Sequence, residues 1–360
     1  MNDDTGSLVN PFAAYQQMLR ERLHFFLHTL HPAVYADVVR AFEDEVKILH
    51  QADQHIHPPQ NVRTSGIWSL LPLLIAQHIA PEIDPTYASS VALAVESFVT
   101  AIDLLDDIED EDQTDIVHKL GTARVINTAA ILFTLAQQAL LSLSELGISP
   151  TTILLLLQTL QESSFVVSTG QHLDIVVENR PAHEFTREEC IEIAATKSGA
   201  LLRLACLMGA QCAGASDELC TKYAEFGELL GIAAQLDNDC NDLYYLLYSQ
   251  GWALSSEEIV RTSNMMKSDL VRGKKTLPIV LAAAEIAKTQ GASSVNMQDA
   301  LQQAATFSDK ENEVYVRAFR EGIITAWGIC LLYRERASER LQELEAQKPF
   351  TPLLHLLVGV

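Results

Sequence analysis

The stretch Asp103-Leu-Leu-Asp-Asp-Ile-Glu-Asp-Glu-Asp112 is the strongest indication in the sequence of both the fold and the function. It ends an apolar run, residues 88–105, whose hydrophobic residues recur every three or four positions, as in a helix. On a helix, Asp106 and Asp110 stack one turn apart, with Asp107 beside them. Because like charges on one face repel, a divalent cation such as Mg²⁺, which prefers oxygen ligands, would stabilise the cluster. The alternative is a solvated helix end, the usual fate of an isolated acidic run.

A second cluster, Gln235-Leu-Asp-Asn-Asp-Cys-Asn-Asp242, favours the metal site over the solvated end. It interrupts the apolar helical pattern of residues 217–249, and on a helix its Asn238 and Asp242 share one face. Two oxygen-rich clusters on different helices, facing each other across a bundle interior, would hold several divalent cations. The sequence therefore predicts a centre with more than one metal ion.

The composition indicates a large helical protein. Hydrophobic residues make up 48% of the 360 residues and charged residues 20%, which is enough apolar material for a substantial core. Proline and glycine are scarce, and helical periodicity dominates. We expect an all-α fold with a disordered segment, residues 1–10, followed by a single domain, residues 11–360. The predicted helices are two within residues 11–49, broken near His31-Pro32, and one each over residues 66–79, 86–110, 122–146, 150–175, 187–213, 217–249, 297–307 and 311–347.

The charge and the cysteines exclude several classes of protein. A formal net charge of −22 argues against a nucleic-acid binder and against adsorption to anionic membranes. The six cysteines form no C-x-x-C pair, no secretory signal opens the sequence, and no eighteen apolar residues are consecutive. We therefore expect a cytoplasmic protein with reduced thiols and no transmembrane segment. An anionic substrate is compatible with this charge if metal ions bridge it to the carboxylates.

Three further features lie between and after the two clusters. Gly170, in Gly-Gln-His-Leu-Asp174, costs about 1 kcal/mol against alanine in a helix, and indicates close approach by a ligand or by another helix. Lys197, in Lys-Ser-Gly199, either extends to the surface or meets a carboxylate, because an unpaired buried lysine is costly. The basic turn within residues 269–278 supplies cations of the kind that bind a diphosphate.

Taken in order, these motifs resemble the trans-isoprenyl diphosphate synthase superfamily. The matching patterns are D-D-x-x-D, G-Q-x-x-D, K-[ST]-G/A, Q-x-x-[DN]-D-x-x-D and G-K-x-T-L-P, and they lie between Gly66 and Pro278. The resemblance implies a large helical bundle of the isoprenoid synthase (class I terpenoid) type, which forms homodimers. It also implies three Mg²⁺ ions that hold the diphosphate of an allylic isoprenyl substrate while a carbocation forms in an apolar cavity.

The resemblance also assigns roles to residues by position. It implies a first metal site at Asp106, Asp107 and Asp110 and a second at Asn238, Asp239 and Asp242. It implies contacts to the substrate diphosphate from Gln171, Lys197, Gln235 and Lys274. The residues implied to be catalytic are Asp106, Asp110, Lys197 and Gln235.

Two departures from the family pattern concern the binding site for a second substrate, isopentenyl diphosphate. Members that use isopentenyl diphosphate carry a G-K-x-x-R-P motif early in the chain and an R-R-G after the first acidic motif. Here the first motif is Gly66-Ile-Trp-Ser-Leu-Leu-Pro72, without a cation, and no arginine pair follows Asp112. A second diphosphate would be unpaired there, at a high cost in desolvation. We therefore expect that isopentenyl diphosphate is not the acceptor.

One branch of the superfamily shows this combination. Residues 106–112, 197–199 and 231–239 resemble ComQ-type isoprenyltransferases, which prenylate a tryptophan in a small signalling peptide. Related bacterial enzymes are terpene synthases, whose N-x-x-x-S-x-x-x-E pattern is incomplete here because Leu246 occupies its third ligand position. The remaining alternative is an ordinary isopentenyl-diphosphate-condensing synthase or its inactive regulatory subunit.

The substrate length follows from the residues before the first acidic motif. In the resembled family, bulky side chains one turn upstream limit the chain. Here these residues are Ala101 and Ile102, with Phe98 one turn deeper. This arrangement predicts a C15 or C20 substrate.

Overall fold

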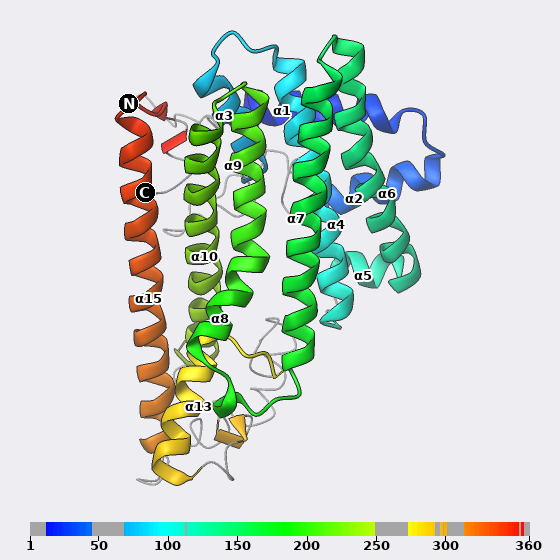
Figure 1. Ribbon diagram of the computed structural model, residues 1–360. Helices are drawn as coiled ribbons and strands as arrows, with labels where there is room; N and C mark the ends of the chain where they lie inside the picture. The colour runs from blue at the N-terminus through cyan, green and yellow to red at the C-terminus, as the bar shows by residue number, and fades with distance from the viewer. Residues whose placement is uncertain are drawn as a thin grey trace, which may run out of the picture. The chain divides into compact units, whose positions relative to one another are not determined.

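The computed structural model describes residues 12–44, 68–111, 114–248, 273–291, 296–297, 299–300, 313–352 and 354–355. Throughout these ranges the regular elements are helical, which confirms the predicted all-α fold (Figure 1). The α-helices are α1 (Ala13–Leu27), α2 (Pro32–Asp44), α3 (Leu71–Ile79), α4 (Pro85–Glu109), α5 (Asp115–Leu120), α6 (Thr122–Leu141), α7 (Pro150–Val177), α8 (Arg187–Ala194), α9 (Ala200–Cys212), α10 (Asp217–Tyr248), α13 (Leu277–Gln290) and α15 (Glu313–Glu345). Short 3₁₀ turns are η2 (Trp68–Leu70), η3 (Ser142–Leu146) and η4 (Ala182–Glu184), and η5 (Ala195–Gly199) is a π-helical turn.

The chain forms two compact units, each built from separate stretches of sequence. Unit 1 comprises Met1–Gln161, Leu204–Ala224 and Leu344–Val360, and unit 2 comprises Glu162–Arg203 and Glu225–Glu343. The first acidic motif belongs to unit 1, and the second belongs to unit 2 together with the implied diphosphate contacts. The single domain over residues 11–360 stays a prediction.

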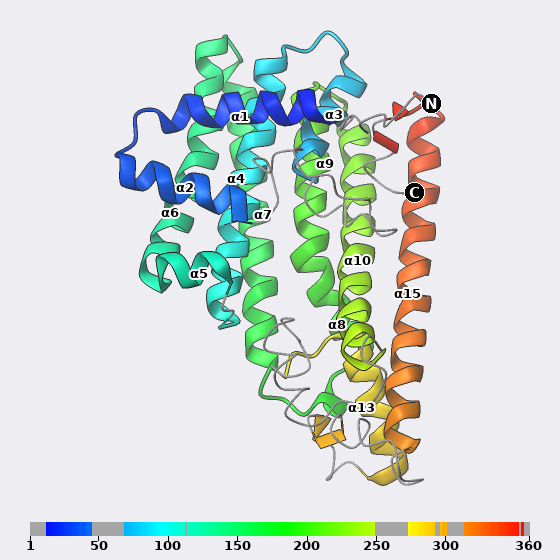
Figure 2. The same cartoon turned by 180° about the vertical axis from the view of Figure 1, so that it is seen from behind.

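Helix α4 is the core of unit 1. It begins at Asp84, whose carboxylate accepts a 2.7 Å hydrogen bond from the backbone N–H of Thr86, and its apolar residues are buried over most of its length. It packs beside α6, where the rings of Phe98 and Phe133 lie 5.8 Å apart, and α1 crosses it (Figure 2). These contacts hold the end of α4, which carries the first acidic motif.

In the part of the chain that the structure describes, two segments are long and apolar enough to cross a membrane by length and composition, α4 and Thr122–Leu146. In α4, 78% of the most apolar window is buried within the protein, compared with 50% in Thr122–Leu146. The apolar character of α4 is therefore that of a core helix. Thr122–Leu146 leaves more of its surface uncovered.

In unit 2, α15 packs on α13 and α10. An ideal Cβ on Gly322 would lie 2.6 Å from the carbonyl oxygen of Pro278, so only glycine permits this approach of α15 to α13. Phe319 is fully buried in the same cluster. Arg334 of α15 forms a 3.3 Å ion pair with Asp237 of α10. These contacts fix α15 along one side of α10, as both views show (Figures 1 and 2).

Most helix predictions agree with the structure within a few residues, and three differ for physical reasons. Pro72 lies in the first turn of α3, which begins at Leu71, and not in a helix interior; proline is tolerated in a first turn. No helix was predicted between residues 110 and 122, but Thr114 caps the short helix α5 there. The helix predicted over residues 187–213 is continuous to Cys212, but it contains the π turn η5 between α8 and α9, which was not predicted.

Several predictions concern segments outside the described residues. These are the disordered N-terminus (residues 1–10), the start of the helix at residues 66–67, the residues directly after the first acidic motif (112–113), the residues between the helix predicted over 217–249 and the basic turn (250–268), the start of the basic turn (269–272) and most of the helix predicted over residues 297–307.

Candidate functional site

The first acidic motif occupies the last turn of α4 and its C-cap. Asp107 is buried, at 6% exposure, Asp106 and Asp110 are half-buried, and Glu109 is exposed on another face. The backbone N–H of Asp110 donates to the carbonyl oxygen of Asp106, at 2.8 Å. The helix therefore places the carboxylates of Asp106, Asp107 and Asp110 in at least partly buried positions, whereas that of Glu109 is exposed.

The position of this cluster is electrostatically unfavourable in the protein alone. It lies at the negative end of the dipole of α4, and the last turn of α4 contains no basic residue. Bound divalent cations would offset that cost, and an all-oxygen donor set fits Mg²⁺. Within the described residues, no three His, Cys, Asp or Glu side chains form a cage that could hold an ion by themselves. Mg²⁺ commonly takes only one or two carboxylates and completes its shell with substrate phosphates, so the residues fit this ion.

Two consecutive side-chain hydrogen bonds, which connect η5 with α10, hold the second acidic motif. Ser198 donates a 2.5 Å hydrogen bond to Oε1 of Gln235, whose Nε2 donates a 2.8 Å bond to Oδ1 of Asp239. Asp239 is buried at 7% exposure, Asp242 is half-buried and Asn238 is exposed. Gln235 therefore orients Asp239, a positioning role in addition to the diphosphate contact implied by the motif.

Lys197 lies in the π turn η5, a type of turn that is rare and frequent at functional sites. Its ammonium group donates to Oδ2 of Asp174 at 2.8 Å, and the two side chains are 17% and 15% exposed. Of the two alternatives left open by the sequence, the pairing with a carboxylate is the one observed. Asp174 was part of the G-Q-x-x-D motif, but no role had been assigned to it.

Two glycines make room for the π turn. An ideal Cβ on Gly170 of α7 would lie 2.5 Å from Oγ1 of Thr196, and one on Gly231 of α10 would lie 2.3 Å from the carbonyl oxygen of Ser198. The close approach at Gly170 is therefore by another helix of the protein. Together the two glycines clamp η5 between α7 and α10, which fixes the backbone that carries Lys197.

We expect Gly231→Ala to destabilise the protein, because the added methyl group overlaps the carbonyl of Ser198. Overpacking of this kind costs about 1–3 kcal/mol, which exceeds the gain in helix propensity. Denaturant unfolding measures the change. Gly199→Ala is the matched control, since its Cβ would first meet Cγ1 of Ile232 at 3.1 Å, a side-chain atom that can shift. An increase in stability for Gly231→Ala would contradict this account of the clamp.

Gln171 has an unusual environment. The residue is 9% exposed, and neither Nε2 nor Oε1 has a hydrogen-bond partner among the described residues. A buried amide without partners costs free energy, about 1–3 kcal/mol by mutational data. Such a group is expected where a ligand completes the hydrogen bonds, and its NH₂ group is a suitable donor to a phosphate oxygen.

The basic turn contains two lysines with different roles. Lys275 is buried, and its ammonium group donates to the carbonyl oxygens of Glu178, at 2.7 Å, and of Gly273. Burial lowers the pKa of Lys275 below its usual value. Lys274 is half-buried and lines a cavity of about 330 Å³ with Arg180. Lys275 therefore fixes the turn, and Lys274 stays the implied diphosphate ligand.

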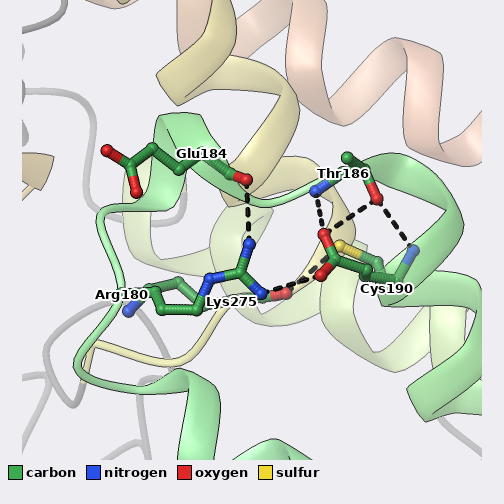
Figure 3. Close-up of polar contacts among 6 residues, drawn as sticks. Arg180, Glu184, Thr186, Cys190 and Lys275 are labelled. Carbon is green, nitrogen blue, oxygen red and sulfur yellow. Dashed lines mark hydrogen bonds and ion pairs between the residues drawn. The ribbon is translucent and has the colours of Figure 1, made fainter.

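A polar network supports this turn from the segment between α7 and α8 (Figure 3). Thr186 and Glu189 form a capping box at the start of α8, and Arg180 donates to Glu189 at 2.7 Å and to the carbonyl oxygen of Glu184 at 3.0 Å. Cys190 donates from its thiol to the carbonyl oxygen of Lys275 at 3.3 Å. The network ties the turn to α8 without using Lys274.

The described residues where a second diphosphate would need cations are uncharged or already paired. Ser69, Leu70 and Leu71 are buried in unit 1. After the first acidic motif, the first cation along the described chain is Lys119, which is exposed and pairs with Asp115 at 3.2 Å. The next is Arg124, which pairs with Asp37. The loss of the second diphosphate site stays a prediction.

The implied site residues fall into two groups. Unit 1 holds the first metal site, and unit 2 holds Gln171, Lys197 and Lys274 with the second metal site. In unit 2, η5 connects the motifs: Lys197 meets Asp174, and Ser198 reaches Asp239 through Gln235. The assignments of ligands and contacts remain predictions.

Known proteins resemble the chain over most of its length. Residues 65–316 match the family model of polyprenyl synthetases. A geranylgeranyl diphosphate synthase of Methanosarcina mazei is 25% identical over 291 residues, 79% of this chain and 81% of the relative. The tryptophan prenyltransferase ComQ of Bacillus spizizenii is 28% identical over 192 residues, 49% of this chain and 63% of that enzyme. The crystal structure of a polyprenyl synthetase from Streptomyces coelicolor A3(2) has the same fold, with a TM-score of 0.66, 23% identity, and coverage of 95% of this chain and 97% of that one. The chain therefore belongs to the polyprenyl synthetase family, whose members are prenyltransferase enzymes.

Proposed function

We propose that the protein ionises a C15 or C20 allylic isoprenyl diphosphate with the help of Mg²⁺ and transfers the prenyl cation to an acceptor other than isopentenyl diphosphate. The observation that carries the proposal is the contrast between the two diphosphate sites. The carboxylates, Lys197, Lys274 and Gln171 of the first are present, whereas the cations of the second are missing from the sequence. We infer that the acceptor is the tryptophan of a small peptide, the activity that the name of the relative ComQ describes.

The chemistry of the proposed step follows from its charges. Enzymes of this family generally use divalent metal ions, which stabilise the negative charge that gathers on the leaving diphosphate. Asp106, Asp107 and Asp110 would hold ions at the first acidic motif, and Asn238, Asp239 and Asp242 would hold ions at the second. Lys197 and Lys274 would donate charge-assisted hydrogen bonds to the phosphate oxygens as the C–O bond breaks, which lowers the barrier.

The length of the substrate rests on α4. Ala101 is fully buried and small, whereas Phe98, one turn deeper, is fully buried and large, with its ring 5.8 Å from that of Phe133. An isoprenoid chain running along α4 would therefore pass Ala101 and stop at the aromatic pair. This arrangement supports a C15 or C20 chain.

Terpene cyclisation is the second candidate, because it needs the same first diphosphate site and no second one. The two are separated by incubating the protein with geranyl, farnesyl or geranylgeranyl diphosphate and Mg²⁺ and analysing the products. We expect little hydrocarbon without a peptide, and a prenylated peptide when a tryptophan-containing acceptor encoded next to this protein is added. A cyclised product formed without peptide would replace the peptide-transferase proposal by a terpene synthase.

We also propose that the protein is a homodimer that pairs through α7. Large hydrophobic residues are exposed on this helix among polar ones, and Phe165, at 77% exposure, is the most exposed of the large hydrophobic residues that the structure describes. Leu154 and Val176 continue the stripe at 56% and 54%. An exposed stripe of large hydrophobic residues often marks an interaction surface, and a second copy would cover this one.

Phe165→Glu should convert this dimer to a monomer, because it would bury a charge in an apolar interface. Light scattering during size-exclusion chromatography measures the mass, and circular dichroism checks that the helices are retained. An unchanged dimer would mean that α7 is not the interface. A cytoplasmic location stays a prediction, and the six cysteines are free and buried, as in a reducing compartment.

A further inference from the structure

The face of α10 that carries Asp239 also meets the π turn η5, within unit 2. Gly231, Gln235 and Asp239 follow one another at four-residue intervals and therefore lie on one face of the helix. The backbone of Ser198 packs against the first of these positions, because any side chain at Gly231 would overlap the carbonyl oxygen of Ser198. At the next position, the Ser198 hydroxyl reaches Oε1 of Gln235 at 2.5 Å. The close approach at Gly231 therefore sets where this hydroxyl lies.

The donor and the acceptor of each hydrogen bond in this face follow from the chemistry of the groups. An ionised carboxylate only accepts, so the atom of Gln235 that lies 2.8 Å from Oδ1 of Asp239 is its NH₂ nitrogen. The carbonyl oxygen of the same amide then faces Ser198, which must donate. If the amide turned over, its carbonyl oxygen would face the carboxylate, and the lone pairs of the two groups would repel each other. The Ser198 hydroxyl therefore stabilises the one orientation of Gln235 that binds Asp239.

We propose that Ser198 is a positioning residue for the second metal site. Its hydroxyl holds the amide of Gln235, and the amide in turn holds Asp239 in the orientation that binds a divalent cation. Of the two N–H groups of the Gln235 amide, one donates to Asp239, and the other is the donor for a phosphate oxygen. This role rests on the metal and diphosphate binding of the proposed function. Ser198 acts through Gln235 and needs no contact of its own with the metal or the substrate.

The place of Ser198 in η5 also connects the two kinds of ligand. The preceding residue, Lys197, is the implied donor to the diphosphate, and its ammonium group pairs with Asp174 of α7 at 2.8 Å. Lys197 and Ser198 are consecutive in the same π turn, so a shift of this turn would move the diphosphate donor and change the orientation of Asp239 together. The turn therefore couples the binding of the diphosphate to that of the metal ion at the second acidic motif.

The binding of inorganic pyrophosphate in excess Mg²⁺, measured by isothermal titration calorimetry, tests this role without turnover. Ser198→Ala should weaken the binding by about threefold to tenfold, the effect of one hydrogen bond, and Ser198→Thr, which keeps the hydroxyl, should retain the affinity of the unmodified protein. Thr196→Val is the matched control, because it removes a hydroxyl of the same turn that bonds the carbonyl oxygens of Glu192 and Ile193 in its own helix. Its affinity should be unchanged, and circular dichroism checks that all variants are folded. Equal affinities of Ser198→Ala and the unmodified protein would overturn the role.

A double-mutant cycle shows whether Ser198 acts through Gln235. Gln235→Ala should weaken pyrophosphate binding by itself, and the addition of Ser198→Ala should then have no further effect. Additive losses would contradict the proposal, because Ser198 would then contribute independently of the amide. Gln235→Glu should weaken the binding more than Ser198→Ala does, because it places two carboxylates at the 2.8 Å contact with Asp239.

The same titrations separate a failure of this role from a failure of the proposed function. If the unmodified protein did not bind pyrophosphate with Mg²⁺, the proposed function would fail and the role of Ser198 with it. If the unmodified protein bound pyrophosphate and Ser198→Ala bound it equally well, only the role of Ser198 would fail.

Discussion

Asp106→Ala should abolish diphosphate release from an allylic substrate, with a fall in kcat/KM of about a thousandfold or more. The reason is the loss of metal binding at the end of α4, where metal ions stabilise the leaving diphosphate by several kcal/mol, and every 1.36 kcal/mol corresponds to about tenfold in rate. The fall in kcat/KM should persist at saturating Mg²⁺. A coupled assay that detects released diphosphate measures it.

Glu109→Gln is the matched control, because Glu109 belongs to the same acidic stretch but is exposed on another face of α4. It should retain nearly full activity. Equal losses in the two variants would indicate a general effect of charge at the end of the helix. If the unmodified protein itself releases no diphosphate, it would be the inactive regulatory subunit of a prenyl synthase.

Lys197→Met should lower kcat by about a hundredfold to a thousandfold, comparable to the removal of one preorganised donor to a developing anion. It should also destabilise the protein, because it leaves Asp174, only 15% exposed, without the ion pair at 2.8 Å. Adding Asp174→Asn should recover the stability and leave the activity low. Denaturant unfolding and steady-state kinetics on the same preparations separate the two effects.

Lys222→Met controls for the loss of a lysine. Lys222 pairs with Glu218 on the surface of α10, in an exposed pair of the kind that contributes little. The activity and the stability of the Lys222→Met variant should therefore change little. Full activity in Lys197→Met would show that the π turn has no part in binding the diphosphate.

Hydrophobic periodicity was sufficient to predict most of the helices. Helix α4 was expected over residues 86–110 and runs from Pro85 to Glu109, because its long apolar repeat has the period of a helix. The π turn η5 was not predictable in this way. It adds one residue to a turn without changing composition, and the spaces that accommodate it come from Gly170 and Gly231, on two other helices.

For the site residues too, the sequence predicted which residues belong to the motifs but not which of them contact each other in the fold. Motif spacing identified Lys197, Gln235 and the acidic residues. It could not show that Gln235 connects Ser198 with Asp239, or that Asp174 pairs with Lys197, because these bonds join residues far apart in the sequence. Nor could it distinguish Lys274 from Lys275, which are neighbours of the same type. Only the contacts of Lys275 with the backbone near the end of α7 reveal it as the structural one.

The central claim is that an allylic diphosphate is ionised while isopentenyl diphosphate is not used as acceptor. The most direct test supplies Mg²⁺, farnesyl diphosphate and isopentenyl diphosphate together, each diphosphate with its own radiolabel on the hydrocarbon part. We predict that the farnesyl label leaves the diphosphate fraction when a tryptophan-containing acceptor peptide is present, and that the isopentenyl label does not enter a longer prenyl chain. Joint incorporation of both labels into one elongated diphosphate at an ordinary rate would contradict the account.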